Sequence, residues 1–421
     1  MINQEGYVKS KIKLTIGILI SNRIQYIEKV MSGIKPLLDE LPAELIAVDT
    51  VGPEKTDGSI EVVKRFTSKI YPFKWCNDFA KARNVCLENA SGEWFMFLDD
   101  DEVFEDVTEI VDFFKTGECE DYLSGIYHLK NHLPNNVTRM STVLRMVRRK
   151  PDTRFVGRIH EAFNEVYEPC KLFEAYVNHY GYLFLDKGSV KKHQERNLSI
   201  LEEEIEKNGL NASIGAQLVQ ELIFTEGTEE RGYKELKKCL SLLPKTEIST
   251  ATGQWLLTAG IGYYYNLNRH EEALAEAKKI KESYSLNETC TLIIEGTCIY
   301  SAAKLEKWDE CIGAAKRYAR VYEFLEKNRK EAIRQITLGS EDYKTIEYAR
   351  GVLAIGISAC LKEKRFNEAL EFLAKLKEYG CEPIEEYSKV IDEILFYSDN
   401  KELKNAYLAH FLTDEGMKLY R

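Results

Sequence analysis

The sequence predicts an α/β domain over residues 1–186, followed by an all-helical repeat region over residues 187–421. Apolar runs of strand length alternate with helical patterns in the first half of the chain. One such run, at residues 93–98, leads directly into four acidic residues. Beyond Asp186 the strand patterns disappear, and the helix-forming residues Glu, Lys, Leu and Ala dominate.

The first half of the chain predicts the element order β-α-β-α-β-α-β. Its apolar runs end at polar residues or at loops rich in Gly, Pro and Asp, as strands of a nucleotide-binding α/β sheet do. The predicted strands lie at residues 13–20, 44–48, 69–71 and 93–98, the first two helices at 24–37 and 59–66, and the segment 75–84 precedes the last strand.

An acidic cluster follows the last of these strands. Asp99, Asp100, Asp101 and Glu102 are consecutive, and carboxylates so close together repel one another unless a positive charge joins them. Oxygen ligands favour Mg²⁺ or Mn²⁺, which commonly bridge to substrate phosphates. Open α/β sheets bind their ligands where such strands end. The cluster therefore predicts a metal site, with a solvated acidic loop as the alternative.

The rest of the α/β domain predicts an amphipathic helix at 106–115 and two antiparallel strands at 124–132 and 138–147. A basic run covers residues 145–150. We expect Arg148 to face a diphosphate or an acceptor, because guanidinium groups bind phosphate through two hydrogen bonds. Arg149 and Lys150 are expected at a solvated strand end.

The composition is that of a globular protein. The 421 residues are 44% hydrophobic and 30% charged, and the net charge of −10 argues against a general nucleic-acid binder. Ten cysteines without a Cys-x-x-Cys pair indicate reduced thiols in a cytosolic protein. The N-terminus does not resemble a signal peptide, and no apolar run reaches the ~20 residues of a membrane span. We therefore expect a cytoplasmic protein without a transmembrane segment.

The second half contains a recurring motif in which a ring or small side chain precedes acidic residues and an apolar pair. Its first three copies begin near Gly232, Arg269 and Lys307, at intervals of 37 and 38 residues, and a fourth begins at Arg365. Tetratricopeptide units repeat about every 34 residues. Small residues before each motif would let paired helices approach closely, as in an α-solenoid. Residues 328–345 are expected to form an extended helix or an insertion.

Several segments together resemble family 2 glycosyltransferases of the GT-A fold. Two positions depart from the family pattern: Asn22-Arg23 stands where such enzymes usually have Asn-Glu, and residues 51–55 replace a shorter Gly-Ser segment. The later segments resemble the subgroup with tetratricopeptide-like helices, similar to sublancin-type peptide S-glycosyltransferases. The segments that carry the resemblance are Asp49-Thr50, Thr56-Asp57-Gly58, 75–84, Leu98-Asp99-Asp100-Asp101-Glu102, Arg148, 157–161 and 179–182.

The resemblance implies an inverting transferase that uses Mn²⁺ or Mg²⁺. The sugar would move from a nucleoside diphosphate donor, expected to be UDP, to a Ser or Thr hydroxyl or a Cys thiol of a peptide or protein. The roles that it implies are nucleobase binding for Asp49, ribose binding for Asp99, metal binding for Asp101 and His179, diphosphate binding for Arg83 or Arg148, and general-base catalysis for Glu161 or else His160, with Asn22, Asp78 and Asp100 completing the donor site.

Three alternatives remain open on the sequence. The acceptor could be a lipid or a cell-surface glycan precursor, or the transferase domain could be an inactive part of a repeat scaffold, which Arg23 in place of Glu would favour. Glu161 could serve as a salt-bridge partner of Arg158. The helical repeats are expected to bind the acceptor or a second copy of the chain, and the resemblance suggests a homodimer.

Overall fold

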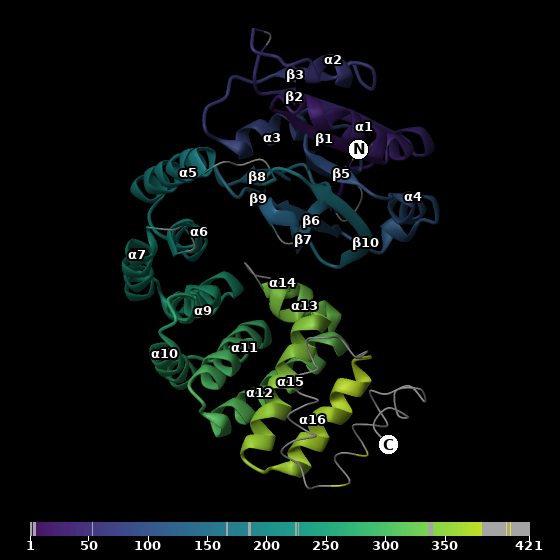
Figure 1. The fold of residues 1–421 in the computed structure, drawn as a ribbon. Coiled ribbons are helices and arrows are strands. Elements are labelled where there is room, and N and C mark those ends of the chain that lie inside the picture. The colour runs from purple at the N-terminus through teal and green to yellow at the C-terminus, as the bar shows by residue number, and fades with distance from the viewer. Residues whose placement is uncertain are drawn as a thin grey trace. The chain divides into compact units, whose positions relative to one another are not determined.

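The computed structural model describes residues 2, 6–52, 54–165, 167–183, 187–223, 225, 227–335, 340–380, 401 and 405 (Figure 1). The chain divides into two compact units, Met1–Glu203 and Glu204–Arg421. The predicted domain boundary at Asp186 lies outside the described residues, as does Pro53 of the predicted loop, so the boundary stays a prediction.

The first unit is built on an eight-stranded mixed sheet with the order β3-β2-β1-β4-β7-β6-β10-β5. The four strands from β3 to β4 are parallel, β7 is antiparallel to both β4 and β6, and β10 is parallel to β6. A separate ribbon pairs β8 with β9. The strands are β1 Leu14–Ile20, β2 Ala43–Asp49, β3 Ile70–Pro72, β4 Trp94–Asp99, β5 Glu102–Phe104, β6 Ser124–Leu133, β7 Val137–Arg148, β8 Phe155–Val156, β9 Ala162–Phe163 and β10 Cys170–His179.

Helices cover both faces of this sheet, which explains why its central strands are apolar throughout. All seven residues of β1 are buried. Residues of α1 (Ile24–Glu40) and α4 (Thr108–Lys115) share one core with alternate residues of β1 and β4. Residues of α3 (Phe79–Glu88) share a second core with the other residues of these strands. The predicted β/α order is thus confirmed, although α2 (Ser59–Val63) ends three residues before the predicted Phe66.

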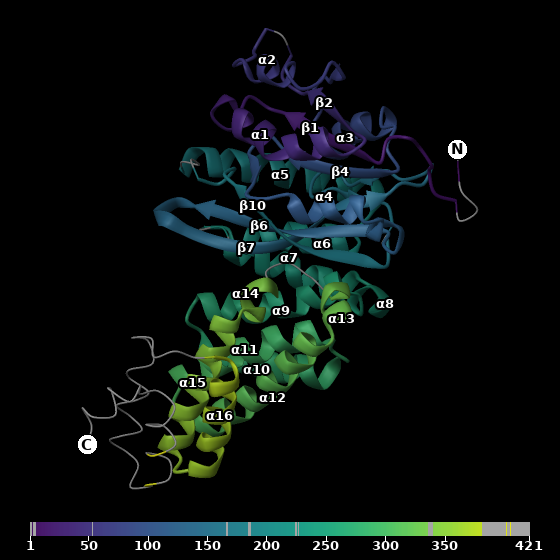
Figure 2. The ribbon, with the colours of Figure 1, turned by 90° about the vertical axis from the view of Figure 1, so that its right-hand side faces the viewer.

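The described part of the second unit is built mainly from helices that pack in consecutive pairs. The pairs are α6 with α7, α9 with α10, α11 with α12, and α15 with α16 (Figure 2). Three of the four predicted motifs begin within one residue of the second helix of a pair, and the Gly232 motif lies inside α7. The described residues of 328–345 include two short helices, which corresponds to the predicted insertion and not to one extended helix.

The helical bounds complete the description of this half of the chain. None of the described helices is both long and apolar enough to cross a bilayer. The helices are α5 Lys187–Asn208, α6 Ala212–Ile223, α7 Glu229–Leu242, α8 Lys245–Ile248, α9 Ala251–Asn266, α10 His270–Ser283, α11 Glu288–Lys304, α12 Trp308–Lys327, α13 Arg329–Arg334, α14 Ser340–Lys344, α15 Ile346–Lys362 and α16 Phe366–Glu378. The predicted fold class, an α/β domain followed by a helical region, is confirmed.

Most of the described cysteines are buried, and none of them forms a disulfide. Burial raises the pKa of the thiols of Cys86, Cys290, Cys311 and Cys360 to about 12. Cys76 is the exposed exception among the described cysteines.

Two glycines of α9 provide a matched test of the packing in the helical unit. A Cβ at Gly253 would lie 2.1 Å from the backbone oxygen of Glu247, whereas a Cβ at Gly262 would meet no atom within 4 Å. Gly253→Ala should therefore cost ~1–3 kcal/mol of unfolding free energy. Gly262→Ala should be neutral or stabilising by up to ~1 kcal/mol, because alanine favours helix. Urea unfolding followed by circular dichroism measures both, and equal effects would contradict this close packing of α8 on α9.

Candidate active site

The acidic cluster lies where the parallel strands of the sheet end. Asp99 is the last residue of β4, Asp100 and Asp101 form the following turn, and Glu102 begins β5. The Asp99 side chain is 33% exposed, whereas Asp100, Asp101 and Glu102 are buried. Because β1 and β4 are parallel, with Leu19 opposite Asp99, the chain after β1 reaches the same edge. Asp99 is thus the carboxylate of the cluster most open to a ligand.

Two buried arginines neutralise much of this negative charge. Arg83 of α3 donates from Nη2 to Asp99 Oδ1 at 2.7 Å and from Nε to Glu161. Arg145 of β7 donates to Glu102, and its Nη2 lies 3.7 Å from Asp99 Oδ2. Burial opposes the ionisation of Asp99, but Arg83 and Arg145 outweigh it and lower its pKa to about 2. Asp99 therefore stays ionised and is held in one orientation.

The aromatic ring of Phe97 supports both guanidinium groups. The guanidinium carbons of Arg83 and Arg145 each lie 4.4 Å from the ring centroid, within the range of a cation–π contact. Among the described residues, Arg83 Nη1 and Arg145 Nε are buried without a hydrogen-bond partner. The network consequently retains buried donors that a ligand could satisfy.

Asp100 connects the end of β1 to the turn after β4. Ser21 donates to it from the backbone N, at 2.6 Å from Oδ2, and from Oγ, at 3.1 Å from Oδ1. Burial raises the pKa of Asp100 to about 7. Both of its oxygens are used inside the protein, so its contacts are those of a residue that shapes the turn.

Asp101 faces two different groups. Its Oδ1 lies 3.6 Å from Nε2 of His179, the last residue of β10, and its Oδ2 lies 3.4 Å from Nε of Arg23. Burial and the neighbouring Asp99 raise the pKa of Asp101 to about 6. Burial also lowers the pKa of His179 to about 4, so its imidazole is neutral at neutral pH.

The second ring nitrogen of His179 fixes which nitrogen carries the proton. Nδ1 lies 2.7 Å from Oδ1 of Asn131, whose amide nitrogen in turn donates to Ser141. An amide oxygen only accepts, so the proton is on Nδ1 and the lone pair of Nε2 points towards Asp101. Metal-binding histidines are commonly oriented by this kind of contact.

The space between Asp101 and His179 fits a metal ion. A Cβ on Gly181 would lie 2.7 Å from His179 Nε2 and 3.0 Å from Asp101 Oδ2, so the absence of a side chain there keeps this space open. The carboxylate oxygen suits Mn²⁺ or Mg²⁺, and the neutral imidazole can add one nitrogen ligand. Within the described part of the chain, no three His, Cys, Asp or Glu side chains form a metal-binding group. The remaining ligands would have to come from phosphate and water.

Three further predicted residues lie near the ends of the parallel strands or the start of α3. Asp49 Oδ1, at the end of β2, accepts from the backbone N of Val51 and of Gly52 at 2.9 and 3.0 Å. Asn22 adopts a left-handed backbone (φ 68°) and joins the turn after β1 to the backbone of Lys55 and Asp57. Asp78 caps α3 by accepting from the backbone N of Lys81.

The structure does not bring Arg148 to the acidic cluster. Because β7 runs antiparallel to β4, Arg148 lies opposite Trp94, at the far end of β4 from Asp99. It pairs there with Glu120. Arg145, three residues earlier, is the arginine of the basic run that reaches the acidic cluster. The basic run alone could not separate the two arginines without the pairing of β7 with β4.

The two candidate bases lie in the loop between β8 and β9. Glu161 pairs with Arg83 and not with Arg158, which instead contacts Glu203 at 2.7 Å. His160 has a left-handed backbone (φ 49°) and an exposed side chain. The structure therefore joins Glu161 to the Asp99 network through Arg83, and places His160 next to it in the chain.

Comparison with known proteins shows what the first unit is similar to. Residues 15–172 match the family model described as glycosyl transferase family 2. The glycosyltransferase SunS of Bacillus subtilis (strain 168) is 27% identical over 218 residues, 47% of this chain and 46% of SunS. A TPR repeat-containing protein of Synechococcus elongatus is 23% identical over 224 residues, 50% of this chain and 53% of that protein. The chain thus spans about half the length of these relatives.

Solved structures show more distant likeness. The S. aureus protein TarS (1–349, in complex with UDP-GlcNAc) is 13% identical with a TM-score of 0.34, covering 75% of this chain and 92% of its own. The mannosyltransferase PcManGT of Pyrobaculum calidifontis, in complex with GDP-Man and Mn²⁺, is 14% identical with a TM-score of 0.34, covering 77% and 86%.

The family match and the TPR-containing relative confirm the resemblance predicted from the sequence. The matched segment contains β1, β4 and the acidic cluster with both of its arginines. Residues 15–172 of this chain are therefore similar to the domain shared by family 2 glycosyltransferases.

Proposed function

We propose that this protein is an inverting, metal-dependent glycosyltransferase that moves a sugar from a UDP-linked donor to a peptide or protein side chain. The observation that carries the proposal is the pair of metal-binding groups, Asp101 and neutral His179, on either side of the open space at Gly181. The likeness to SunS, a glycosyltransferase, and the repeats after the domain support a macromolecular acceptor. The acceptor atom is a Ser or Thr oxygen or a Cys sulfur.

The donor would bind along the ends of the parallel strands. Asp99 is the most exposed carboxylate of the cluster and is oriented by Arg83, which suits a hydrogen bond from the ribose. Asp49 uses Oδ1 for its own turn, so Oδ2 is the oxygen proposed to accept from the nucleobase. The unpartnered Nη1 of Arg83 supports a role for this arginine beside the diphosphate.

Asp101 and His179 would hold Mn²⁺ or Mg²⁺ together with the diphosphate oxygens. Bound there, the ion would stabilise the negative charge that develops on the leaving group. His179 is suited to this place because Asn131 keeps its proton on Nδ1 and its lone pair towards Asp101. Asp101 is suited because its carboxylate is buried beside that lone pair.

Glu161 is the proposed general base, with His160 as the second candidate. A single displacement needs one group that removes the proton of the acceptor hydroxyl or thiol. Arg83 fixes the Glu161 carboxylate on the same guanidinium that holds Asp99, which supports a place beside the donor. A purely structural role, as the anionic partner of buried Arg83, is the alternative that a substitution can test.

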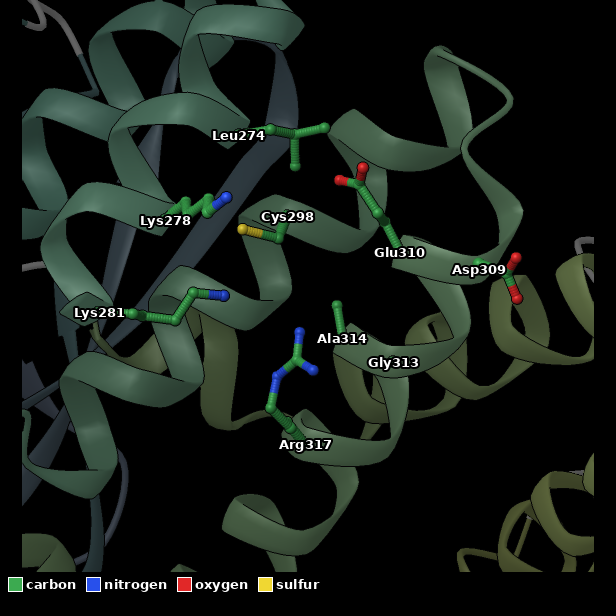
Figure 3. A pocket seen from close by; sticks show the side chains of 9 residues that line it. All are labelled: Leu274, Lys278, Lys281, Cys298, Asp309, Glu310, Gly313, Ala314 and Arg317. Atoms are coloured by element: carbon green, nitrogen blue, oxygen red, sulfur yellow. The ribbon is translucent and has the colours of Figure 1, made fainter.

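The helical unit is proposed to recognise the acceptor. It contains a cavity of 380 Å³ into which Lys278, Lys281 and Arg317 point beside Cys298 (Figure 3). Lys281 and Arg317 both contact buried Glu295, at 3.1 and 2.8 Å. Lys278 is exposed, so its ammonium group is the one best placed to meet an anionic group of an acceptor. The homodimer expected from the resemblance remains a prediction.

The reaction itself can be tested by incubating the purified chain with a panel of nucleotide sugars and Mn²⁺ or Mg²⁺. Nucleotide release should require a metal and one preferred donor. Release that is unaffected by EDTA, or absent with every nucleotide sugar and acceptor tried, would contradict the proposal.

Asp101→Asn should abolish metal-dependent turnover, by ~10²-fold or more, because the amide removes the charge that attracts a cation. Asp112→Asn, on an exposed position of α4, is the matched control and should retain activity. Nucleotide release and circular dichroism measure activity and folding. Unchanged turnover in folded Asp101→Asn would refute the metal assignment.

Glu161→Gln should reduce transfer by ~10²-fold or more while donor affinity persists, because glutamine keeps the shape of the side chain but is not a base. His160→Gln is measured in parallel, with donor affinity obtained by titration. Collapse of transfer only in His160→Gln would assign the base to His160. Loss of donor binding in Glu161→Gln, with normal transfer at saturation, would make Glu161 a binding residue.

Lys278→Glu should lower transfer to a peptide or protein acceptor by about tenfold, because it reverses a charge at the cavity. Donor hydrolysis in the absence of acceptor should be unchanged. Lys279→Glu, at the next residue of α10, is the matched control, because Lys279 is also exposed and does not line the cavity. Equal transfer rates in the two variants would argue against acceptor binding at this cavity.

A further inference from the structure

Arg23 holds a fixed position beside the proposed metal site. Its backbone carbonyl accepts from the N–H groups of Tyr26 and Ile27 at 2.8 and 2.9 Å, so it belongs to the start of α1. The preceding Asn22 ties the turn to the backbone of Lys55 and Asp57. The turn between β1 and α1 therefore fixes the backbone from which the Arg23 side chain reaches Asp101.

The contact between Arg23 and Asp101 is an ion pair on a particular oxygen. Nε of Arg23 lies 3.4 Å from Asp101 Oδ2, and among the described residues this buried nitrogen has no hydrogen-bond partner. Oδ2 is also the oxygen that lies 3.0 Å from the open position at Gly181, opposite His179 Nε2. The guanidinium and a metal ion would therefore share one carboxylate oxygen.

This arrangement changes the electrostatics of metal binding. In the free protein Asp101 already has a cationic neighbour, the guanidinium of Arg23. A divalent ion entering alone would add two positive charges close to the guanidinium, and like charges at such distances repel strongly in a partly buried site. A nucleoside diphosphate brings negative charge that offsets both cations.

We propose that Arg23 is an internal counter-cation of Asp101 that weakens metal binding to the free protein, so that the divalent ion binds together with the nucleoside diphosphate. This inference rests on the metal site of the proposed function. The metal ion and the diphosphate would each raise the affinity of the protein for the other, and Arg23 would supply a large part of this coupling free energy.

The test is a titration of the full chain with Mn²⁺, followed by the electron paramagnetic resonance signal of free Mn²⁺, with and without saturating UDP. Arg23→Met keeps the length and apolar stem of the side chain and removes its charge. Its affinity for Mn²⁺ without UDP should rise about tenfold, after allowance for solvent screening. With UDP present the affinity should change less, so the coupling factor should fall.

Three control variants separate this effect from others. Arg23→Lys keeps the charge and should stay close to the original affinity. Arg154→Met removes the same charge from an exposed position and should leave Mn²⁺ binding unchanged. Asp101→Asn should abolish binding in both the original and the Arg23→Met background.

The outcomes distinguish the inference from the proposed function. Binding of Mn²⁺ that depends on Asp101 but is unchanged or weaker in Arg23→Met would overturn the role of Arg23 while leaving the metal site in place. Failure of all folded variants to bind Mn²⁺, with or without UDP, would overturn both. The UDP coupling factor is the ratio of the Mn²⁺ affinities with and without UDP. Tighter Mn²⁺ binding in Arg23→Met with an unchanged coupling factor would also overturn the inference, because Arg23 is proposed to supply this coupling.

Discussion

The ion pairs of the buried Arg83 guanidinium are the interactions on which the first unit depends. They join three separate pieces of the chain: α3, the end of β4 through Asp99, and the loop between β8 and β9 through Glu161. Loss of one partner of such a group would leave a buried charge unpaired, which is far more costly than loss of a surface ion pair. Phe97 lies beneath both this arginine and Arg145, so an apolar strand and a polar site are built from the same residues of β4.

Much of the first unit could be predicted because its information is local. Strands buried on both faces read as continuous apolar runs, and the acidic cluster is contiguous in the sequence. Which of Arg145 and Arg148 reaches the acidic cluster is not a local property of the sequence. It depends on which strand β7 pairs with and in which direction, and the basic run contains neither fact. The same is true of Glu161, whose partner Arg83 is 78 residues away, whereas Arg158, the partner considered as an alternative, is a near neighbour. Only the family resemblance predicts that Asp101 and His179 share a site. The 3.6 Å distance between Asp101 Oδ1 and His179 Nε2 results from the antiparallel pairing of β10 with β5.

In the helical unit the sequence predicts the spacing of the repeated motifs, but it does not predict the structure of residues 328–345, which interrupt them. Motifs at the start of second helices are local signals, since they combine an apolar pair with acidic residues in the first turn, where the helix dipole favours them. Residues 328–345 carry similar helix-forming residues, so the sequence left open whether they form one helix or an insertion. Contacts with α11 position this segment. Gln335, which follows α13, accepts from the backbone N of Thr289 and donates to Glu288 at the start of α11, and α14 packs on α11. Long-range contacts of this kind have no sequence period.

The buried cysteines have a consequence if the proposed acceptor atom is sulfur. A thiol becomes a nucleophile by losing its proton, and apolar surroundings make that loss unfavourable. The cysteines buried in the cores of the two units are therefore unreactive towards an electrophilic sugar, whatever the affinity of the domain for its donor. Selectivity for a foreign thiol over the enzyme's own thiols would then arise from packing in the protein interior, without any recognition step. Cys76, in the segment before α3, is the described thiol to which this protection does not extend.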